Sequence, residues 1–237
     1  MTFLLVSPRS GAEILAAEHR DFLVATGLDE LDQAILDTAD ATLPDLSGYE
    51  GVFIGGSPFN MTSEHYDEWQ THVHQILGEL VDSPMNTMFV CFGAGFTTAY
   101  KGGTVSRSHP EASGPTTVHL TEAGLHDPLT RNLPNYFTAL TGHTENIETP
   151  APSARVLATS PTCPVQIIRV NQSTWACQFH AEMDAIAMKN RMDFYFDYGY
   201  FSPEDYESIV KKLPSIDTSG AAQFLRNFVE FCRTENN

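Results

Sequence analysis

The chain has 237 residues and carries 13 Lys and Arg against 30 Asp and Glu, so its formal net charge is −17. A surface this acidic repels phosphate groups, so we expect no nucleic-acid partner and no binding to anionic membranes. The hydrophobic content of 42% is enough for a sizeable core, and the length suits one α/β domain that spans residues 1–237.

The cysteines and the first residues indicate the compartment. The four cysteines stand far apart and form no C-x-x-C pair, which excludes the usual zinc spacing and does not resemble a disulfide framework. Residues 1–7 lack the basic flank and the length of a secretion signal, and no apolar run is long enough to cross a membrane. We therefore expect a reduced, cytoplasmic setting in which thiols remain free.

The first segments predict a strand, a helix and a second strand. Residues 3–6 form an apolar run that is typical of a buried strand. Ser10 and Glu13 match a capping box, so we expect Ser10 to cap a helix that ends at Gly27. Residues 34–36 are a candidate for the second strand.

Two adjacent glycines follow the next predicted strand. Residues 52–54 form a short apolar run, which Gly55 and Gly56 interrupt. Such a pair most often marks a simple turn from a strand to a loop. It also lets the backbone approach a ligand closely and direct an N–H group toward an anion. The sequence leaves both interpretations open.

A further helix-forming pattern follows the glycine pair. Apolar residues recur at helical spacing up to Leu80, and Ser63 has the character of an N-cap, so we expect the helix to begin there and to pack one face on a sheet. His72 and His74 lie on this helix two positions apart. They do not share a helix face, so they predict no metal pair.

Residues 88–95 contain the most informative local pattern. An apolar strand ends at Cys91, and Gly93 and Gly95 turn the chain into a helix predicted over 94–100. This order is typical of a nucleophile elbow, which exposes a side chain at the carboxyl end of a sheet. The positive end of the following helix lowers the pKa of such a thiol. A buried structural cysteine is the alternative interpretation.

The same stretch does not predict a nucleotide site. Residues 93–95 match the start of a dinucleotide-binding motif, but Thr98 stands where the third glycine belongs. We therefore expect no cofactor, and the cysteine and histidine spacings predict no metal centre.

The middle of the chain predicts a small antiparallel patch. Short β-like runs occur at 116–121, 136–140, 155–158 and 165–170, with turn residues between them. His143 and Glu145 lie between two of these runs, in a predicted polar loop. We expect His143 to be a surface or supporting group rather than a catalyst.

Residues 175–182 form the second informative stretch. An apolar strand leads to His180, and Glu182 follows two positions later. If the extended conformation continues, both side chains point to the same face. A carboxylate fixes the tautomer of a neighbouring imidazole, and an imidazole beside a thiol stabilises the thiolate. By itself, however, the H-x-E pattern is common.

The C-terminal part predicts helices around an aromatic segment. Helices are expected over 184–195, after Ser202, and in the final segment, where apolar residues from Phe224 to Cys232 share one face. The segment 194–201 is rich in aromatic residues. It closes over a site, binds a partner or, as the favoured interpretation, packs as an aromatic cluster over the edge of the sheet.

Taken together, three motifs resemble those of the class I glutamine amidotransferases, the triad type found in the amidotransferase part of GMP synthetase. These motifs are Gly55-Gly56-Ser57-Pro58, Cys91-Phe92-Gly93 and Phe179-His180-Ala181-Glu182, and residues 101–105 are similar to the segment after the elbow helix. The resemblance extends from Phe3 to about Cys232. It implies a three-layer, flavodoxin-like fold with a mainly parallel central sheet, helices on both faces and a small antiparallel β patch.

The resemblance also implies a chemistry. In the family, a cysteine attacks the γ-carboxamide of glutamine, a histidine transfers protons and a glutamate orients the histidine. Matching by position assigns these roles to Cys91, His180 and Glu182. The N–H groups of Gly56, next to Gly55, and of Phe92 would form the oxyanion hole.

The chain departs from the family pattern at two positions. The family usually has Gln where this chain has Gly95, and that side chain helps to hold the substrate; glycine cannot make the contact. Ala181 replaces a common Pro, which is a mild change because Pro contributes stiffness rather than chemistry. The substrate is therefore either glutamine or a related γ-glutamyl compound.

Three functional hypotheses follow. An amidotransferase-type enzyme would pass ammonia to a synthetase partner chain or release it, with a stand-alone γ-glutamyl peptidase or hydrolase as a variant. A non-catalytic regulatory protein would keep the fold without the chemistry. A cysteine chaperone or protease of the related flavodoxin-like group would have His after the elbow Cys, whereas this chain has Phe92.

Overall fold

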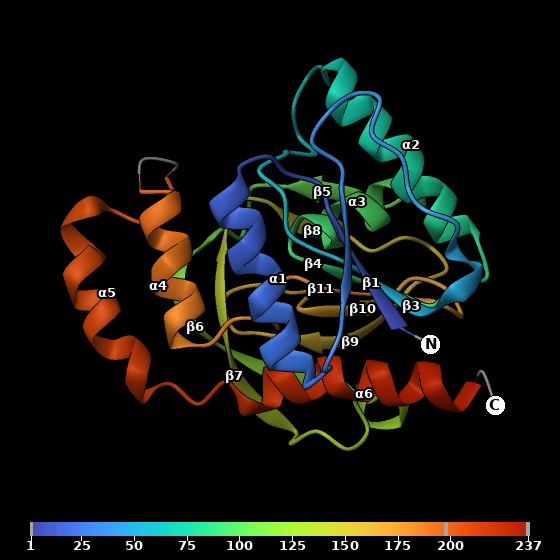
Figure 1. Ribbon diagram of the computed structural model, residues 1–237. Helices are drawn as coiled ribbons and strands as arrows, with labels where there is room; N and C mark the ends of the chain where they lie inside the picture. Colours follow the sequence, from blue (N-terminus) through green and yellow to red (C-terminus); the bar gives the residue numbers. More distant parts are fainter. Residues whose placement is uncertain (1, 197–198, 236–237) are drawn as a thin grey trace.

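The computed structural model describes residues 2–196 and 199–235 (Figure 1). The helices are α1 (Ala12–Thr26), α2 (Glu68–Asp82), α3 (Phe92–Tyr100), α4 (Ala185–Phe194), α5 (Tyr206–Lys212) and α6 (Ser219–Glu235). The strands are β1 (Thr2–Ser7), β2 (Asp32–Ile35), β3 (Tyr49–Ile54), β4 (Thr87–Val90), β5 (Thr104–Ser106), β6 (Glu111–Leu120), β7 (Tyr136–His143), β8 (Asn146–Thr149), β9 (Arg155–Thr159), β10 (Ile167–Arg169) and β11 (Thr174–Cys177).

A large sheet forms the centre of the molecule. Its strand order is β2-β1-β3-β4-β11-β10-β9-β6-β7. The pairings from β2 to β11 are parallel, and those from β11 to β7 are antiparallel. Strands β5 and β8 form a separate two-stranded antiparallel sheet. The expected fold class is confirmed, and most strands from the middle of the chain extend the central sheet.

Helices cover both faces of the parallel half, as Figure 1 shows. Phe3 and Leu5 of β1 belong to the apolar cluster under α1 and α6, whereas Leu4 and Val6 belong to the cluster that includes α2 and α3. Successive residues of a strand point to opposite faces, so a strand buried on both sides consists of a continuous apolar run. This explains why residues 3–6 show no polar alternation.

A smaller apolar cluster lies beside the central layers. It joins α4 to α5 and includes Leu140 of β7 and Phe201. Figure 1 shows α4 and α5 next to each other at one side of the molecule. None of the helices in the described residues combines the length and the apolar composition that a bilayer crossing requires.

Two predicted helix starts are wrong. The N-cap of α1 is Gly11, which forms no side-chain cap, so Ser10 lies outside the helix. The N-cap of α2 is Asp67 rather than Ser63, because the Asp67 carboxylate accepts a hydrogen bond from the N–H of Gln70 at 2.7 Å. The end of α1 is as expected: Gly27 adopts a left-handed conformation with φ 71°.

The contact of α6 with the sheet gives a stability prediction. Phe228 is fully buried, and its ring lies 5.1 Å from that of Phe53 and 6.3 Å from that of Trp175. We expect Phe228→Ala to lower the free energy of unfolding by about 3–5 kcal/mol because it leaves a cavity. Urea titration followed by circular dichroism measures this loss. Val24→Ala, at a position on α1 that is 62% exposed, is the control and should change stability by no more than about 0.5 kcal/mol.

Candidate active site

Three neighbouring parallel strands end together at one edge of the sheet. β4 pairs with β3 on one side and with β11 on the other, and Val90 lies opposite Cys177. Since the carboxyl ends of parallel strands point the same way, the loops that follow them lie close together. These loops carry Gly55 and Gly56 after β3, Cys91 after β4, and His180 and Glu182 after β11.

Cys91 occupies a strained turn between β4 and α3. It has φ 54° and ψ −97°, and it is the only non-glycine residue with a positive φ in the described part of the chain. Its N–H donates to the carbonyl oxygen of Cys177 at 2.8 Å. Gly93 lets α3 approach β4, because a Cβ atom there would lie 2.5 Å from the Cβ of Phe89. This geometry is that of the expected elbow, although α3 begins at Phe92 rather than Ala94.

His180 and Glu182 come together through a turn. β11 ends at Cys177, so the expectation that an extended strand carries both side chains is wrong. Instead, the N–H of His180 donates to the carbonyl oxygen of Leu140 at 2.9 Å, and the chain turns after it. Nδ1 of His180 lies 2.6 Å from Oε1 of Glu182, and both side chains are buried. The carboxylate therefore holds the proton of the ring on Nδ1.

The electrostatics of these three residues depend on one another. Burial raises the pKa of the Cys91 thiol, but the charges of His180 and Arg191 outweigh burial and bring the pKa to about 7. The imidazole acts mainly through its charge, because its Nε2 forms no hydrogen bond of normal geometry with a described residue.

The histidine and the glutamate show the complementary shifts. Burial and Arg191 lower the pKa of His180, whereas the negative charges of Glu182 and Cys91 raise it above its ordinary value. Burial raises the pKa of Glu182, but the charge of His180 lowers it below its ordinary value. A thiol that ionises near neutral pH beside a charged imidazole can act as a nucleophile.

Backbone donors lie next to this thiol. Phe92 is the first residue of α3, and Gly56 follows β3; neither N–H donates to an oxygen of a described residue. A Cβ atom on Gly56 would lie 2.9 Å from Nη2 of Arg9 and 3.2 Å from Cε1 of His180. Only glycine fits at this position without displacing the imidazole. N–H groups in these positions can stabilise the oxyanion that forms on a carbonyl oxygen when the sulfur attacks the carbonyl carbon.

A pocket opens beside Cys91. The loop after β3, helix α3 and the turn after β7 line it, together with Gln178 and Tyr200. Gly95 lies in its wall, where a Cβ atom would meet Met61 and Val105 at 3.5–3.6 Å, which is ordinary contact distance. A side chain at position 95 would therefore be tolerated. Glu145 also lines the pocket and accepts a hydrogen bond from the N–H of Met61 at 2.7 Å.

The described residues of the aromatic segment lie beside the pocket and pack on one another. Tyr200 lines the pocket, while Phe201 packs against Phe196 and Tyr206 with ring centroids 5.7 and 6.0 Å apart. Residues 197–198 of the segment lie outside the described residues.

His143 differs from its expected setting. It is the last residue of β7 and is buried, and its Nε2 lies 2.9 Å from Oε2 of Glu111. Burial raises the pKa of Glu111, but hydrogen bonds from His143 and from Thr162, Thr116 and Gln166 lower it to about 2. Nothing in the local sequence pattern of Glu111 distinguishes it from a surface residue of a strand, so the sequence does not predict this pairing.

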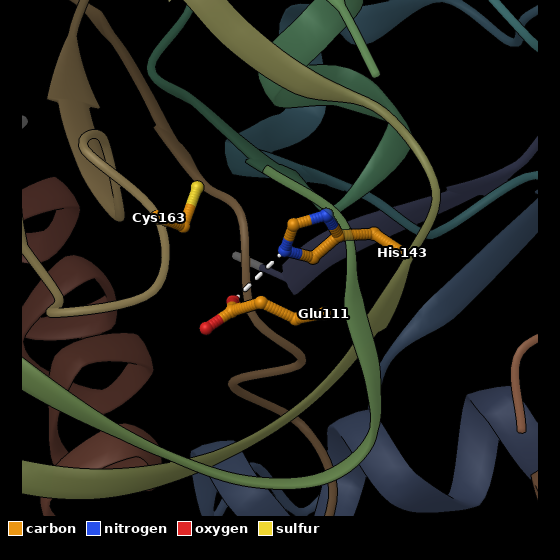
Figure 2. A group of neighbouring side chains, drawn as sticks. All are labelled: Glu111, His143 and Cys163. Atoms are coloured by element: carbon orange, nitrogen blue, oxygen red, sulfur yellow. Dashed lines mark hydrogen bonds and ion pairs between the residues drawn. The ribbon is translucent and has the colours of Figure 1, made fainter. Parts of the chain in front are cut away.

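Glu111, His143 and Cys163 have the residue types of a metal site. Potential ligand atoms of the three lie within 4.8 Å of one another. Figure 2 shows the three side chains gathered together, with a dashed line from His143 to Glu111. Both oxygens of Glu111, however, already accept several hydrogen bonds, and the thiol of Cys163 donates to the carbonyl oxygen of Val165 at 3.5 Å. Burial raises the pKa of the Cys163 thiol to about 12. With three donors already bonded to neighbouring groups, the cluster fits a set of hydrogen-bonded side chains better than a metal site.

The pKa values predict selective alkylation. At pH 7, iodoacetamide should modify Cys91 rather than Cys163, Cys177 or Cys232, whose pKa values burial raises. The rate at Cys91 should increase with pH through a midpoint near 7. Peptide mass spectrometry after timed labelling measures both results.

Removing the imidazole should remove most of the reactivity of Cys91. In His180→Asn the largest effect that opposes burial is lost, so the pKa of Cys91 should rise toward its ordinary value of 9.0 and labelling at pH 7 should slow by up to roughly 50-fold. His126→Asn, at a surface position, is the matched control and should label at the wild-type rate. Equal rates in the two variants would contradict the assigned cause of the shift.

Comparisons with known proteins identify the family. The family described as glutamine amidotransferase class-I matches residues 13–197. A glutamine-hydrolyzing GMP synthase of Aeropyrum pernix is 28% identical over 165 residues, which cover 70% of this chain and 28% of that protein. A glutamine-hydrolyzing GMP synthase subunit from Sulfolobus acidocaldarius is 24% identical over 152 residues, covering 64% of this chain and 77% of the relative.

The fold has solved counterparts. A glutamine amidotransferase structure from Thermotoga maritima superposes with a TM-score of 0.74 at 19% identity, covering 98% of this chain and 97% of that one. The chain spans only 20–28% of the length of the first three GMP synthases that it matches. The family match covers most of the chain, including the loops that carry Gly56, Cys91 and His180. The protein therefore belongs to the class I glutamine amidotransferase family.

Proposed function

We propose that the protein hydrolyses a γ-glutamyl amide, either glutamine or a related compound, through a thioester on Cys91. The observation that carries the proposal is the position of a thiol with a pKa near 7 beside a buried imidazole–carboxylate pair. Cys91 is the nucleophile, His180 the proton donor and acceptor, and Glu182 the group that orients His180. A neutral-range pKa keeps much of the thiol ionised at neutral pH.

The steps follow from the positions of these groups. The sulfur of Cys91 bonds to the γ-carbonyl carbon, and the N–H groups of Gly56 and Phe92 stabilise the resulting oxyanion. The C–N bond then breaks as His180 gives a proton to the leaving nitrogen. Water then attacks the thioester carbon and gives a proton to His180. The C–S bond breaks, and glutamate leaves.

Gly95 supports a substrate larger than glutamine. The usual Gln of the family is absent here, so position 95 offers the pocket no side chain that could hold glutamine. The same absence leaves room for a substituent on the γ-nitrogen. A γ-glutamyl peptidase or hydrolase is therefore the second candidate, and the nature of the released nitrogen compound distinguishes the two.

The fate of ammonia is also part of the proposal. Several relatives are named as single subunits of a GMP synthase, and the matches cover 76–84% of their lengths. If this chain uses glutamine, it passes ammonia to a synthetase partner chain or releases it. A cytoplasmic setting, in which Cys91 stays reduced, and a single domain over residues 1–237 belong to the same proposal.

Cys91→Ala tests the chemistry. We expect the wild-type protein to release ammonia from glutamine or an amine from a γ-glutamyl amide, and the variant to lose this activity by roughly 10⁴-fold or more. A coupled glutamate dehydrogenase assay measures ammonia, and chromatography measures amines. Cys232→Ala, which removes a buried thiol from α6, is the control and should keep kcat unchanged. Activity that persists in Cys91→Ala would refute the thioester, and no activity in the wild type would favour a regulatory protein.

Gly95→Gln tests the substrate. The new amide should lower KM for glutamine by about 3–10-fold, which is the value of one added hydrogen bond, and should reduce turnover of bulky γ-glutamyl amides. Gly95→Ala fills the same Cβ position without an amide and should not lower KM for glutamine. Steady-state kinetics on both substrates provide the readout; identical behaviour of the two variants would show that position 95 does not contact the substrate.

A further inference from the structure

Arg9 is a buried guanidinium directly behind the proposed site. It follows β1 and is only 2% exposed, yet it has no part in the steps above. Burial lowers its pKa, but the carboxylate of Glu18 and the negative charges near the site raise it above the ordinary value. A charged group held in this position must be compensated by close partners.

The first set of contacts holds the glycine loop. Nε of Arg9 donates to the carbonyl oxygen of Gly56 at 3.0 Å. The N–H of Gly55 donates to the carbonyl oxygen of Val6 at 2.9 Å, and Oγ of Ser57 donates to that of Pro8 at 2.7 Å. Gly56 is therefore held on both sides by the end of β1. This set of bonds fixes the backbone that carries one of the two proposed oxyanion donors.

The second set of contacts reaches the proton-transfer pair. A Cβ atom on Gly56 would lie within 3.2 Å of both Nη2 of Arg9 and Cε1 of His180, so the guanidinium and the imidazole pack against the same glycine. Arg9 and Glu182 also line one small cavity at the back of the site. Oε2 of Glu182 is buried without a hydrogen-bond partner among the described residues, and Nη2 of Arg9 has an ion pair with Glu18 but no hydrogen bond of normal geometry.

Glu18 anchors the guanidinium from the opposite side. Its Oε1 lies 3.1 Å from Nη2 of Arg9, and its Oε2 accepts a hydrogen bond from Ser7 at 2.7 Å. Its carboxylate also packs against Gly55, where a Cβ atom would lie 2.5 Å from Oε1. The ion pair therefore reaches from α1 to the loop after β3, and the position of the loop depends on it.

We propose that Arg9 is a positioning residue that holds the Gly55–Gly56 loop in place beside the imidazole of His180, which Glu182 and the carbonyl oxygen of Leu140 hold independently. The inference rests on the proposed function, because it assumes that Gly56 and His180 act on the same substrate. A guanidinium suits this task, since its planar fork can bond a carbonyl and a carboxylate at once. The ammonium of a lysine is a compact point charge and cannot span both partners.

A simple structural role is the competing explanation. A buried ion pair often contributes little net stability, and removing one partner destabilises a fold without any link to catalysis. The two explanations differ in what Arg9→Lys does, because lysine keeps the charge but loses the fork. The variant therefore leaves the electrostatics of the pair with Glu18 largely intact while releasing the loop.

The kinetic test compares Arg9→Lys with wild type on whichever substrate gives Cys91-dependent turnover. We expect kcat to fall by about 10–100-fold, because a misplaced oxyanion donor acts mainly on the transition state, with KM within about threefold. Alkylation of Cys91, which needs no oxyanion donor, should keep its rate and its pH midpoint. A kcat within about threefold of wild type would overturn the proposal. A parallel loss of kcat, alkylation rate and melting temperature would support the structural role instead.

Two further variants guard against misfolding. Arg9→Gln combined with Glu18→Gln removes both charges and leaves none unpaired, so it should fold and still show the loss in kcat. Arg169→Lys is the matched control: this guanidinium pairs with Asp127 at 3.2 Å and lies 4.5 Å from the Trp175 ring, on β10. It should leave kcat unchanged. If Arg169→Lys lowers kcat as much as Arg9→Lys, the effect is one of general stability and the proposal fails.

A readout independent of activity separates this proposal from the proposed function. Hydrogen exchange of a peptide covering residues 54–59 should quicken at least about tenfold in Arg9→Lys, while a peptide covering 167–175 should not change. If wild type has no Cys91-dependent turnover, the proposed function fails, and the exchange result alone decides whether Arg9 holds the loop. Unchanged hydrogen exchange of the 54–59 peptide in Arg9→Lys would refute the proposal that Arg9 holds the loop.

Discussion

The parallel pairing of β4 with β11 is the constraint on which the rest of the site depends. Val90 and Cys177 are 87 positions apart in the chain, yet they lie side by side in the register, and the N–H of Cys91 is bonded to the carbonyl oxygen of Cys177. A shift of this register by one residue would turn every side chain of β11 to the opposite face. The elbow after β4 and the turn after β11 would then no longer meet.

Burial and charge oppose each other at this edge of the sheet. Burial raises the pKa of the Cys91 thiol, and Arg9, Glu18, Glu182 and Arg191 are themselves almost fully buried. Arg9 faces Glu18 at 3.1 Å and Glu182 faces His180 at 2.6 Å, so these buried groups have close partners of opposite sign. The low dielectric that makes them costly also strengthens their action on the thiol. Catalysis at this site, as proposed, depends on this balance more than on any single contact.

The fold constrains Cys91 and His180 more tightly than it constrains the wall of the pocket. Cys91 and His180 are held by strand ends, whereas the pocket wall consists of loops tied together by a few polar contacts, such as Glu145 with the N–H groups of Met61 and Thr62. With Gly95 in place of the family's usual Gln, the pocket wall lacks a side chain at this position, while α3 keeps its helical geometry. Members of a family can therefore keep one chemistry and vary the substrate through these loops.

The sequence by itself determined the fold class, the elbow at Cys91 and the family, because apolar runs, glycine turns and short motifs are local properties. It misplaced the starts of α1 and α2 and described His143 as part of a polar loop, because caps depend on competing nearby groups and burial depends on distant ones. Only the tertiary structure decided that Glu111 pairs with His143 and that Arg9 lies behind Gly56. Those contacts join segments dozens of residues apart, and no periodicity in the chain encodes them.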